Sequence, residues 1–277
     1  MARNPVLFLS FVIVALFIET AYGGEIGVYW GQNSNEGTLS EACATGKYAF
    51  INIAFLNRFG RGRNPGLNLA AGHCGSSPAG CSAAINDCQA KGVKVFLSIG
   101  GTGGDYSLES KADAQKVADY LWKTTTSAGK EGAPAEFYDD LARSLSAYST
   151  PGKKALLSFS PRCGSFNQQL KAVVGTGLFD YVWIRFYDSF TCSYMRSYQG
   201  AMLIAWDNWT AFIKTGKIFV GLPATQDAAE VGYIPPTDAT NLMLPSLKST
   251  PKYGGVVLWS RYFDDNNGYS SSIKVAV

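Results

Sequence analysis

Side chains that could transfer a proton are scarce in the middle of this chain. The sequence has one histidine, His73, and the stretch 123–138 holds two carboxylates, Glu131 and Glu136. A well-placed carboxylic acid that protonates a leaving oxygen accelerates a reaction by about 10²–10⁴-fold. Glu131 lies among glycine and lysine, whereas Glu136 follows Pro134, a residue suited to the first turn of a helix. We therefore expect both to be solvated or helix-capping carboxylates, and we identify no catalytic acid.

Aromatic and small polar residues form a second group, because they fall where predicted strands end. Aromatic rings with scattered polar groups suit sugar rings, whose apolar faces stack on them. For any single aromatic residue, packing under a loop is the better interpretation, but Tyr187 and Trp259 together favour binding. The strand-end residues are Tyr29, Trp30, Asn57, Gly100, Gly101, Pro161, Arg162, Tyr187, Asp188, Pro223 and Trp259.

The elements that would position these residues alternate between strand-like and helix-like patterns. Strands that are apolar on both faces, each followed by a helix, indicate a parallel sheet. We predict seven of them: 25–30, 49–56, 93–99, 155–160, 181–187, 218–223 and 254–260.

The interval between the third and fourth of these strands holds two predicted helices, 108–122 and 134–148. A right-handed crossover accommodates one helix, so an eighth strand is expected between them. The fold class is therefore α/β, a (β/α)8 TIM-type barrel with the fourth strand missing or replaced by a short irregular segment. Thr124, Thr125 and Thr126 could form a short polar strand there; otherwise two strand edges would be unpaired. An open doubly wound sheet is the alternative, but no Gly-x-Gly-x-x-Gly follows a strand.

The N-terminus indicates export. An apolar run from Pro5 to Ile18 precedes Ala21-Tyr22-Gly23, a small-x-small cleavage pattern. The run is shorter than the roughly 20 residues of a membrane span, so we predict a secretory signal over 1–23 and one domain over 24–277. We expect a secreted protein, extracellular or vacuolar, that does not act at a membrane. The net charge of +3 is too small and too dispersed to favour a nucleic-acid partner.

Six cysteines in a secreted chain favour three disulfides. Cys74 and Cys81 would close a short loop, and the remaining pairings stay open. A zinc site would need more than one histidine or a Cys-x2-Cys pair, so we expect no metal and no cofactor. Asn208-Trp209-Thr210 is a glycosylation sequon, but it falls inside a predicted helix, which argues against its use.

Several long blocks resemble plant class III chitinases, which are glycoside hydrolase family 18 enzymes similar to hevamine. They are GVYWGQNSNEGTL, YAFINIAFLNRFG, the GHC-to-CQ region, KVFLSIGG, LFDYVWIRFY, KIFVGLPA and KYGGVVLWSRYFDDNNGYSSSI. The resemblance implies a (β/α)8 barrel, a monomer, and a ligand of chitin or N-acetylglucosamine oligomers bound through Tyr29, Tyr187, Asp188 and Trp259. It also implies the disulfides Cys43–Cys88, Cys74–Cys81 and Cys163–Cys192.

The sequence departs from this family where the chemistry should be. Members carry D-x-x-D-x-D-x-E at the end of the fourth strand: the Glu is the general acid, and the Asp two residues before it orients the N-acetyl group that attacks the anomeric carbon. No such motif occurs here, and the interval from Trp122 to Asp139 is too short to hold it. This substrate-assisted route is an exception to the usual two-carboxylate scheme.

A second departure lies at the sixth strand. The family usually has Gln-x-Tyr-Asn, whereas this chain has Arg185-Phe186-Tyr187-Asp188. Tyr187 is retained, but Arg185 replaces a neutral amide with a cation. Arg185 could pair with Asp188 and so obstruct the sugar site.

Three functions follow from the resemblance, and whether the chain is an enzyme stays open. The first is a chitinase-like protein that binds N-acetylglucosamine oligomers with hydrolysis lost or very weak. The second is a working endochitinase of plant defence, through an unrecognised carboxylate or because the sequence is truncated. The third is a protein-binding role, such as xylanase inhibition with a glycosidase as partner, or seed storage.

Overall fold

Eight parallel strands in a ring form the centre of the molecule. The structure is a computed structural model that describes residues 23–74, 78–124, 127–131, 136–165, 167–214 and 216–277. Each of the eight strands pairs with the next, and β1 pairs with both β10 and β2, which joins the two ends of the series. The strands are β1 (Glu25–Trp30), β2 (Phe50–Phe59), β4 (Lys94–Gly100), β6 (Ser127–Glu131), β7 (Leu156–Ser160), β8 (Tyr181–Arg185), β9 (Lys217–Pro223) and β10 (Tyr253–Trp259).

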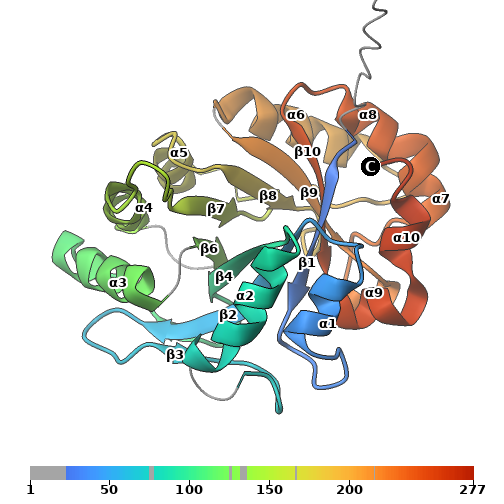
Figure 1. The fold of residues 1–277 in the computed structure, drawn as a ribbon. Helices are drawn as coiled ribbons and strands as arrows, with labels where there is room; N and C mark the ends of the chain where they lie inside the picture. Colours follow the sequence, from blue (N-terminus) through green and yellow to red (C-terminus); the bar gives the residue numbers. More distant parts are fainter. Residues whose placement is uncertain (1–22, 75–77, 125–126, 132–135, 166, 215) are drawn as a thin grey trace, which may run out of the picture.

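Helices follow the strands and lie around them, so the fold is α/β and TIM-barrel-like (Figure 1). Two short strands, β3 (Gly66–Leu67) and β5 (Asp105–Tyr106), pair with β2. The α-helices are α1 (Leu39–Ala44), α2 (Ser82–Ala90), α3 (Lys111–Thr124), α4 (Tyr138–Ala147), α5 (Gln168–Val174), α6 (Gly200–Phe212), α7 (Pro236–Asp238), α8 (Leu244–Lys248), α9 (Arg261–Asn267) and α10 (Tyr269–Ile273). Three shorter helical turns are η1 (Pro78–Cys81), η2 (Gln226–Ala228) and η3 (Ala239–Met243).

Alternation along the strands separates two cores. One set of side chains fills the inside of the ring, where Phe50 stacks on Trp183 with ring centroids 4.7 Å apart. The other set packs between the strands and the surrounding helices. The inner cluster consists of Tyr29, Phe50, Ala54, Phe55, Phe96, Trp183, Phe219 and Val257.

A short fourth strand is present, so a short segment does take this place in the sheet, as one of the two predicted alternatives has it, and the alternative of a missing strand with two unpaired edges is wrong. Strand β6 pairs with β4 from Leu97↔Ala128 to Gly100↔Glu131, and with β7 from Ser127↔Leu156 to Glu131↔Ser160. The three threonines do not supply it: Thr124 ends α3, and Thr125 and Thr126 lie outside the described residues. The sequence Ser-Ala-Gly-Lys-Glu has no β-branched or aromatic residue, so its strand pairing comes from its two neighbours rather than from its own propensity.

The helix after β6 begins later than its sequence pattern predicts. Helix α4 starts at Tyr138, because Phe137 adopts a left-handed backbone with φ of 59°. Pro134 lies outside the described residues, and Glu136 is exposed and precedes the helix. Glu136 is therefore solvated, as one of the two predicted alternatives has it, and it does not open the helix: Asp139 and Asp140 occupy the first turn, where the helix dipole favours negative charge.

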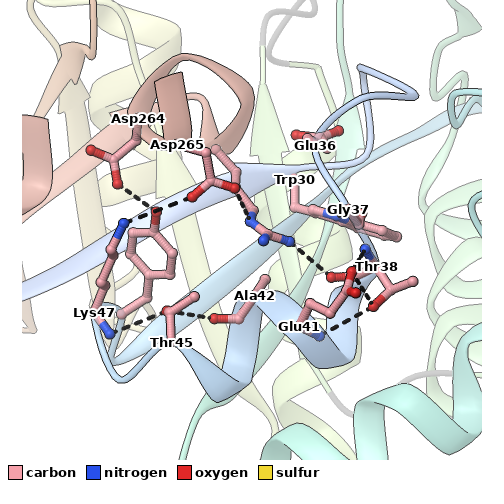
Figure 2. A network of polar contacts seen from close by, with 12 residues as sticks. Trp30, Glu36, Gly37, Thr38, Glu41, Ala42, Thr45, Lys47, Asp264 and Asp265 are labelled. Atoms are coloured by element: carbon pink, nitrogen blue, oxygen red, sulfur yellow. Dashed lines mark hydrogen bonds and ion pairs between the residues drawn. The ribbon is translucent and has the colours of Figure 1, made fainter. Parts of the chain in front are cut away.

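A network of polar contacts ties α1 and the residues that flank it to α9 (Figure 2). Figure 2 shows Asp264 and Asp265 facing the segment that carries Lys47 and Thr38. Arg261 forms an ion pair with Asp265 at 2.9 Å and donates a hydrogen bond to the Thr38 carbonyl at 2.9 Å. Because α1 follows β1 and α9 follows β10, these contacts reinforce the join between the two ends of the ring.

Three disulfides link the chain: Cys43–Cys88, Cys74–Cys81 and Cys163–Cys192, the same pairings that the family resemblance implies. Within the described part of the chain, no helix has the length and apolar character to cross a membrane. The proposed signal segment, apart from Gly23, lies outside the described residues. Asn208 is exposed within α6, whereas Trp209 and Thr210 are buried.

Candidate functional site

Three aromatic side chains meet where β1, β2 and β10 end. The ring centroids of Tyr29 and Trp259 are 5.4 Å apart, and Phe55 stacks nearly parallel to Trp259 at 5.9 Å. Tyr29 and Phe55 are buried, and Trp259 is partly exposed. The peptide bonds Ala54–Phe55 and Trp259–Ser260 are both cis. Trp259 is therefore an accessible aromatic side chain that packs against two buried rings, those of Tyr29 and Phe55.

Beside this aromatic cluster, a hydrogen bond crosses the inside of the barrel from β1 to β7. The Tyr29 hydroxyl donates a hydrogen bond to Ser160 Oγ at 3.2 Å. Ser160 ends β7 and is the register partner of Glu131, which in turn is the partner of Gly100. Glu131 therefore ends the fourth strand at the level of Ser160, although its side chain lies outside what the structure describes. The prediction of a solvated or helix-capping carboxylate stays untested, because only the backbone of Glu131 is described, and that backbone belongs to the sheet.

Two residues earlier along the strands than Ser160, the inner face of the barrel carries buried polar groups that lack hydrogen-bond partners among the described residues. Gly129 is the register partner of Ser98 and Ser158, which are 3% and 2% exposed. Among the described residues, Ser158 Oγ and both amide atoms of Asn52 have no hydrogen-bond partner. A buried polar atom without a partner costs about 1–3 kcal/mol, so this layer would be stabilised by a further polar group. Gly129, with no side chain, supplies none.

Tyr187 and Asp188 follow β8 and lie under a rim loop. Tyr187 is buried, and a Cβ on Gly232 would meet Phe186 O at 2.4 Å and Tyr187 Cα at 2.8 Å, so only glycine allows this close approach. Asp188 is exposed; its N–H donates to Val231 O at 3.1 Å, and its carboxylate accepts from the Glu230 N–H at 3.0 Å. Asp188 therefore binds the rim loop.

Arg185 places a cation on the inner face of β8. It alternates with Tyr181 and Trp183, both of which pack in the inner cluster, and its Cγ lies 3.4 Å from where a Cβ on Gly221 would be. Its backbone is held by the Pro161 carbonyl and the Cys163 N–H. Asp188 binds the rim loop through the Glu230 N–H, and the obstruction of the sugar site by an Arg185–Asp188 pair stays a prediction.

The single histidine has a structural position. His73 is buried, stacks near Trp30 with ring centroids 4.3 Å apart, and has Nε2 2.9 Å from Asn33 O and 3.4 Å from a Glu36 carboxylate oxygen. The same Glu36 oxygen accepts from the backbone N–H groups of Gly31 and Asn33. The pair therefore fixes the loop after β1. Over the described residues, no cluster of three His, Cys, Asp or Glu side chains could hold a metal ion.

The structure thus brings Tyr29 and Trp259 together, as parallel strand ends predict, and adds Phe55 and Ser160, which sequence reasoning missed. Phe55 gave no signal because Ala54 and Phe55 both belong to the inner cluster, at a register shift between β2 and β4. Ser160 was predicted only as the last residue of a strand.

Comparison with known proteins agrees with this geometry. The model of the glycosyl hydrolases family 18 matches residues 25–232. The chain belongs to this family. It is 45% identical to an acidic endochitinase of Vitis vinifera, over all of both chains. Among solved structures, a chitinase from Ipomoea carnea has a TM-score of 0.84 and 39% identity, covering 92% of this chain and 100% of that one.

This family 18 chain is also similar to a protein whose name describes it as an inhibitor of glycosidases. The xylanase and alpha-amylase inhibitor protein from Scadoxus multiflorus has a TM-score of 0.84 and 36% identity, covering 90% of this chain and 97% of that one. The alignment with the Vitis endochitinase extends over 303 positions, whereas this chain has 277 residues, so the relative contains residues that this chain lacks.

Proposed function

We propose that the mouth of the barrel binds β-1,4-linked N-acetylglucosamine oligomers and that hydrolysis is lost or very weak. The observation that carries the proposal is the cluster of Tyr29, Phe55 and Trp259 at the strand ends of a family 18 barrel. Trp259 is partly exposed and is held in place by two buried rings. A rigid, accessible indole suits the apolar face of a sugar ring, and it loses little conformational entropy on binding.

The sequence of β6 is the reason for weak hydrolysis. The family ends its fourth strand with Asp-x-Glu, and β6 ends with Gly129-Lys130-Glu131. In this proposal Glu131 takes the backbone position of the family's general acid, and Gly129 takes the position of the aspartate that orients the N-acetyl group. Positioning a reacting group in a near-attack geometry supplies several kcal/mol of catalysis, so its loss slows attack on the anomeric carbon. Of the family residues named above, Tyr187 is retained.

The test is a paired measurement on purified protein: calorimetric titration with chitotetraose, and chromatography of the products after prolonged incubation. We expect binding with little or no product. Trp259→Ala should weaken binding by about tenfold, which corresponds to 1.4 kcal/mol. Leu242→Ala is the matched control, because Leu242 is an exposed apolar side chain in η3. Equal binding by Trp259→Ala and wild type would refute the proposed site.

A second candidate is inhibition of a glycosidase. It is favoured by the structural similarity to the Scadoxus inhibitor and by two exposed aromatic side chains, Phe190 and Tyr198, between β8 and α6. Assays of xylanase and α-amylase with excess protein distinguish it, since a chitooligosaccharide-binding protein leaves both activities unchanged. Efficient hydrolysis of chitotetraose would instead support the working endochitinase. We further propose export through the signal segment 1–23 and a monomeric state.

A further inference from the structure

Two arginine residues lie next to each other where β7 and β8 end. We propose that Arg162 and Arg185 form a subsite for an anionic sugar, one whose ring carries a carboxylate or a sulfate group, beside the aromatic cluster of the mouth. The inference rests on the proposed function, since it names the class of saccharide that the same mouth prefers. A neutral N-acetylglucosamine oligomer has no charged group that would pair with two arginines.

Backbone hydrogen bonds beyond Ser160 extend the pairing of β7 and β8 by one step. The Arg185 N–H donates to the Pro161 carbonyl at 2.8 Å, and the Cys163 N–H donates to the Arg185 carbonyl at 3.0 Å. These two bonds make Arg162 the parallel register partner of Arg185. Neighbouring strands are about 4.8 Å apart, and register partners direct their side chains to the same face of the sheet. The two guanidinium groups are therefore within reach of one ligand.

The face that the two arginines share is the inside of the barrel. Tyr181 and Trp183 alternate with Arg185 along β8, and both pack in the inner aromatic cluster. Arg185 is partly buried, whereas Arg162 lies beyond the last residue of β7 and is exposed. The pair therefore lies at the mouth, and Arg162 is the more accessible of the two.

A glycine on the neighbouring strand lies between the arginines and Trp259. Gly221 on β9 is the register partner of Arg185, and a Cβ there would meet the Arg185 Cγ at 3.4 Å. Pro223, two residues further along β9, is the register partner of Trp259 on β10. Trp259 is therefore two strands and two residues away from Arg185, which separates their Cα atoms by about 12 Å. A chain of a few sugar rings that stacks on Trp259 reaches the arginines across Gly221.

The charge of the pair favours an anionic ligand. Like charges at neighbouring positions of adjacent strands repel each other, and a bound oxyanion offsets this repulsion. Arg162 forms no ion pair with any residue of the described chain, and the carboxylate of Asp188 accepts the Glu230 N–H on the rim. The planar guanidinium group donates two parallel hydrogen bonds to a carboxylate or a similar oxyanion. Arg162 therefore contacts the anion, and Arg185 adds positive charge beside it.

Three matched tetrasaccharides test this preference by calorimetric titration: chitotetraose, chitotetraose with its primary hydroxyl groups oxidised to carboxylates, and 6-O-sulfated chitotetraose. An exposed ion pair alone changes affinity by about fivefold at most. Two adjacent cations in a partly shielded mouth give more, so we expect at least one anionic tetramer to bind about tenfold tighter than the neutral one. The more tightly bound of the two anionic tetramers identifies the preferred group. Added NaCl should reduce the preference, because salt screens exposed charges.

Substitutions locate the preference, with thermal melts to establish that each variant is folded. Arg162→Gln should remove most of the ratio between anionic and neutral affinity, and Arg185→Gln should also reduce it. Arg162→Lys keeps the charge without the planar fork, so it should retain part of the ratio. Arg143→Gln is the matched control, because Arg143 is an exposed arginine on helix α4, outside the ring of strands, and this variant should keep the whole ratio.

The outcomes separate this inference from the proposed function. Equal affinity of wild type for the neutral and both anionic tetramers would overturn the inference, while binding of chitotetraose would still support the proposed function. A preference that survives Arg162→Gln would also overturn it, because the anion would then be bound elsewhere. If only anionic tetramers bind, and Arg162→Gln abolishes their binding, the inference stands and the proposal for the neutral oligomer fails. The absence of binding by all three tetramers would overturn both.

Discussion

Replacing Tyr48 with phenylalanine tests how the two ends of the barrel are joined. Asp264 is fully buried and accepts hydrogen bonds from the Tyr48 hydroxyl and from the N–H and hydroxyl of Ser270. Tyr48→Phe keeps the ring in its buried site and removes one donor from a buried carboxylate. A hydrogen bond to a charged group contributes about 1.5–3 kcal/mol, so we expect the free energy of unfolding to fall by about 2 kcal/mol. For a domain of this size that loss lowers Tm by about 4–8 °C.

Urea denaturation and thermal melts followed by circular dichroism measure this change. Tyr198→Phe is the matched control, because Tyr198 is 56% exposed and its variant should stay within about 0.5 kcal/mol of wild type. If the free energy of unfolding falls no further for Tyr48→Phe than for Tyr198→Phe, the argument that the Tyr48–Asp264 contact ties the chain before β2 to α9 is refuted.

The same variant has a predicted pH dependence. Burial, and next the charge of Asp264, raise the pKa of Tyr48 well above its ordinary value of 10.0. The raised pKa contributes stability that is complete below about pH 10 and is lost as the pH rises above it, because the unfolded chain then releases the phenolic proton. Phenylalanine has no such proton, so the difference between wild type and Tyr48→Phe should narrow above pH 10. A constant difference from pH 7 to pH 11 would contradict the assignment.

Three further outcomes are expected. Because β6 pairs on both sides, the protein should unfold in one cooperative transition with coincident near- and far-ultraviolet circular dichroism, whereas an early loss of near-ultraviolet signal would indicate an incompletely closed ring. Removing the Cys163–Cys192 bridge by a double alanine substitution should cost about 2–4 kcal/mol in urea denaturation, and no change would show that the loop between them is constrained in other ways. Asn208 lies inside helix α6 and should be unmodified after expression in a plant secretory system, so treatment with a glycan-releasing amidase should leave the mass unchanged.

Local composition was a good guide where a strand is apolar on both faces. Each of the seven predicted strands overlaps an observed one, because near-continuous apolar runs are typical of strands that are covered by helices on both faces of a parallel sheet. Tyr29 and Trp259 were predicted at the mouth for a related reason: the carboxyl ends of parallel strands meet at one edge, and β1 and β10 are neighbours. That reasoning needs only the order of elements along the chain.

The parts that could not be predicted depend on contacts between segments far apart in sequence. Residues 127–131 form a strand because their backbone pairs with β4 on one side and with β7 on the other. Nothing in the sequence Ser-Ala-Gly-Lys-Glu favours a strand. For this reason the sequence does not predict that Glu131 ends a strand. The late start of α4 follows from the backbone of Phe137, and the inward turn of Phe55 from a register shift. None of these leaves a periodic pattern in the sequence.

The most direct test of the central claim is one incubation of the purified wild-type protein with chitotetraose, in which bound ligand and released products are followed together. The account predicts a saturable calorimetric signal while the tetrasaccharide stays intact over many hours. Rapid conversion to shorter oligomers would contradict the proposal that hydrolysis is lost or very weak, and the absence of any binding would contradict the assignment of the aromatic mouth.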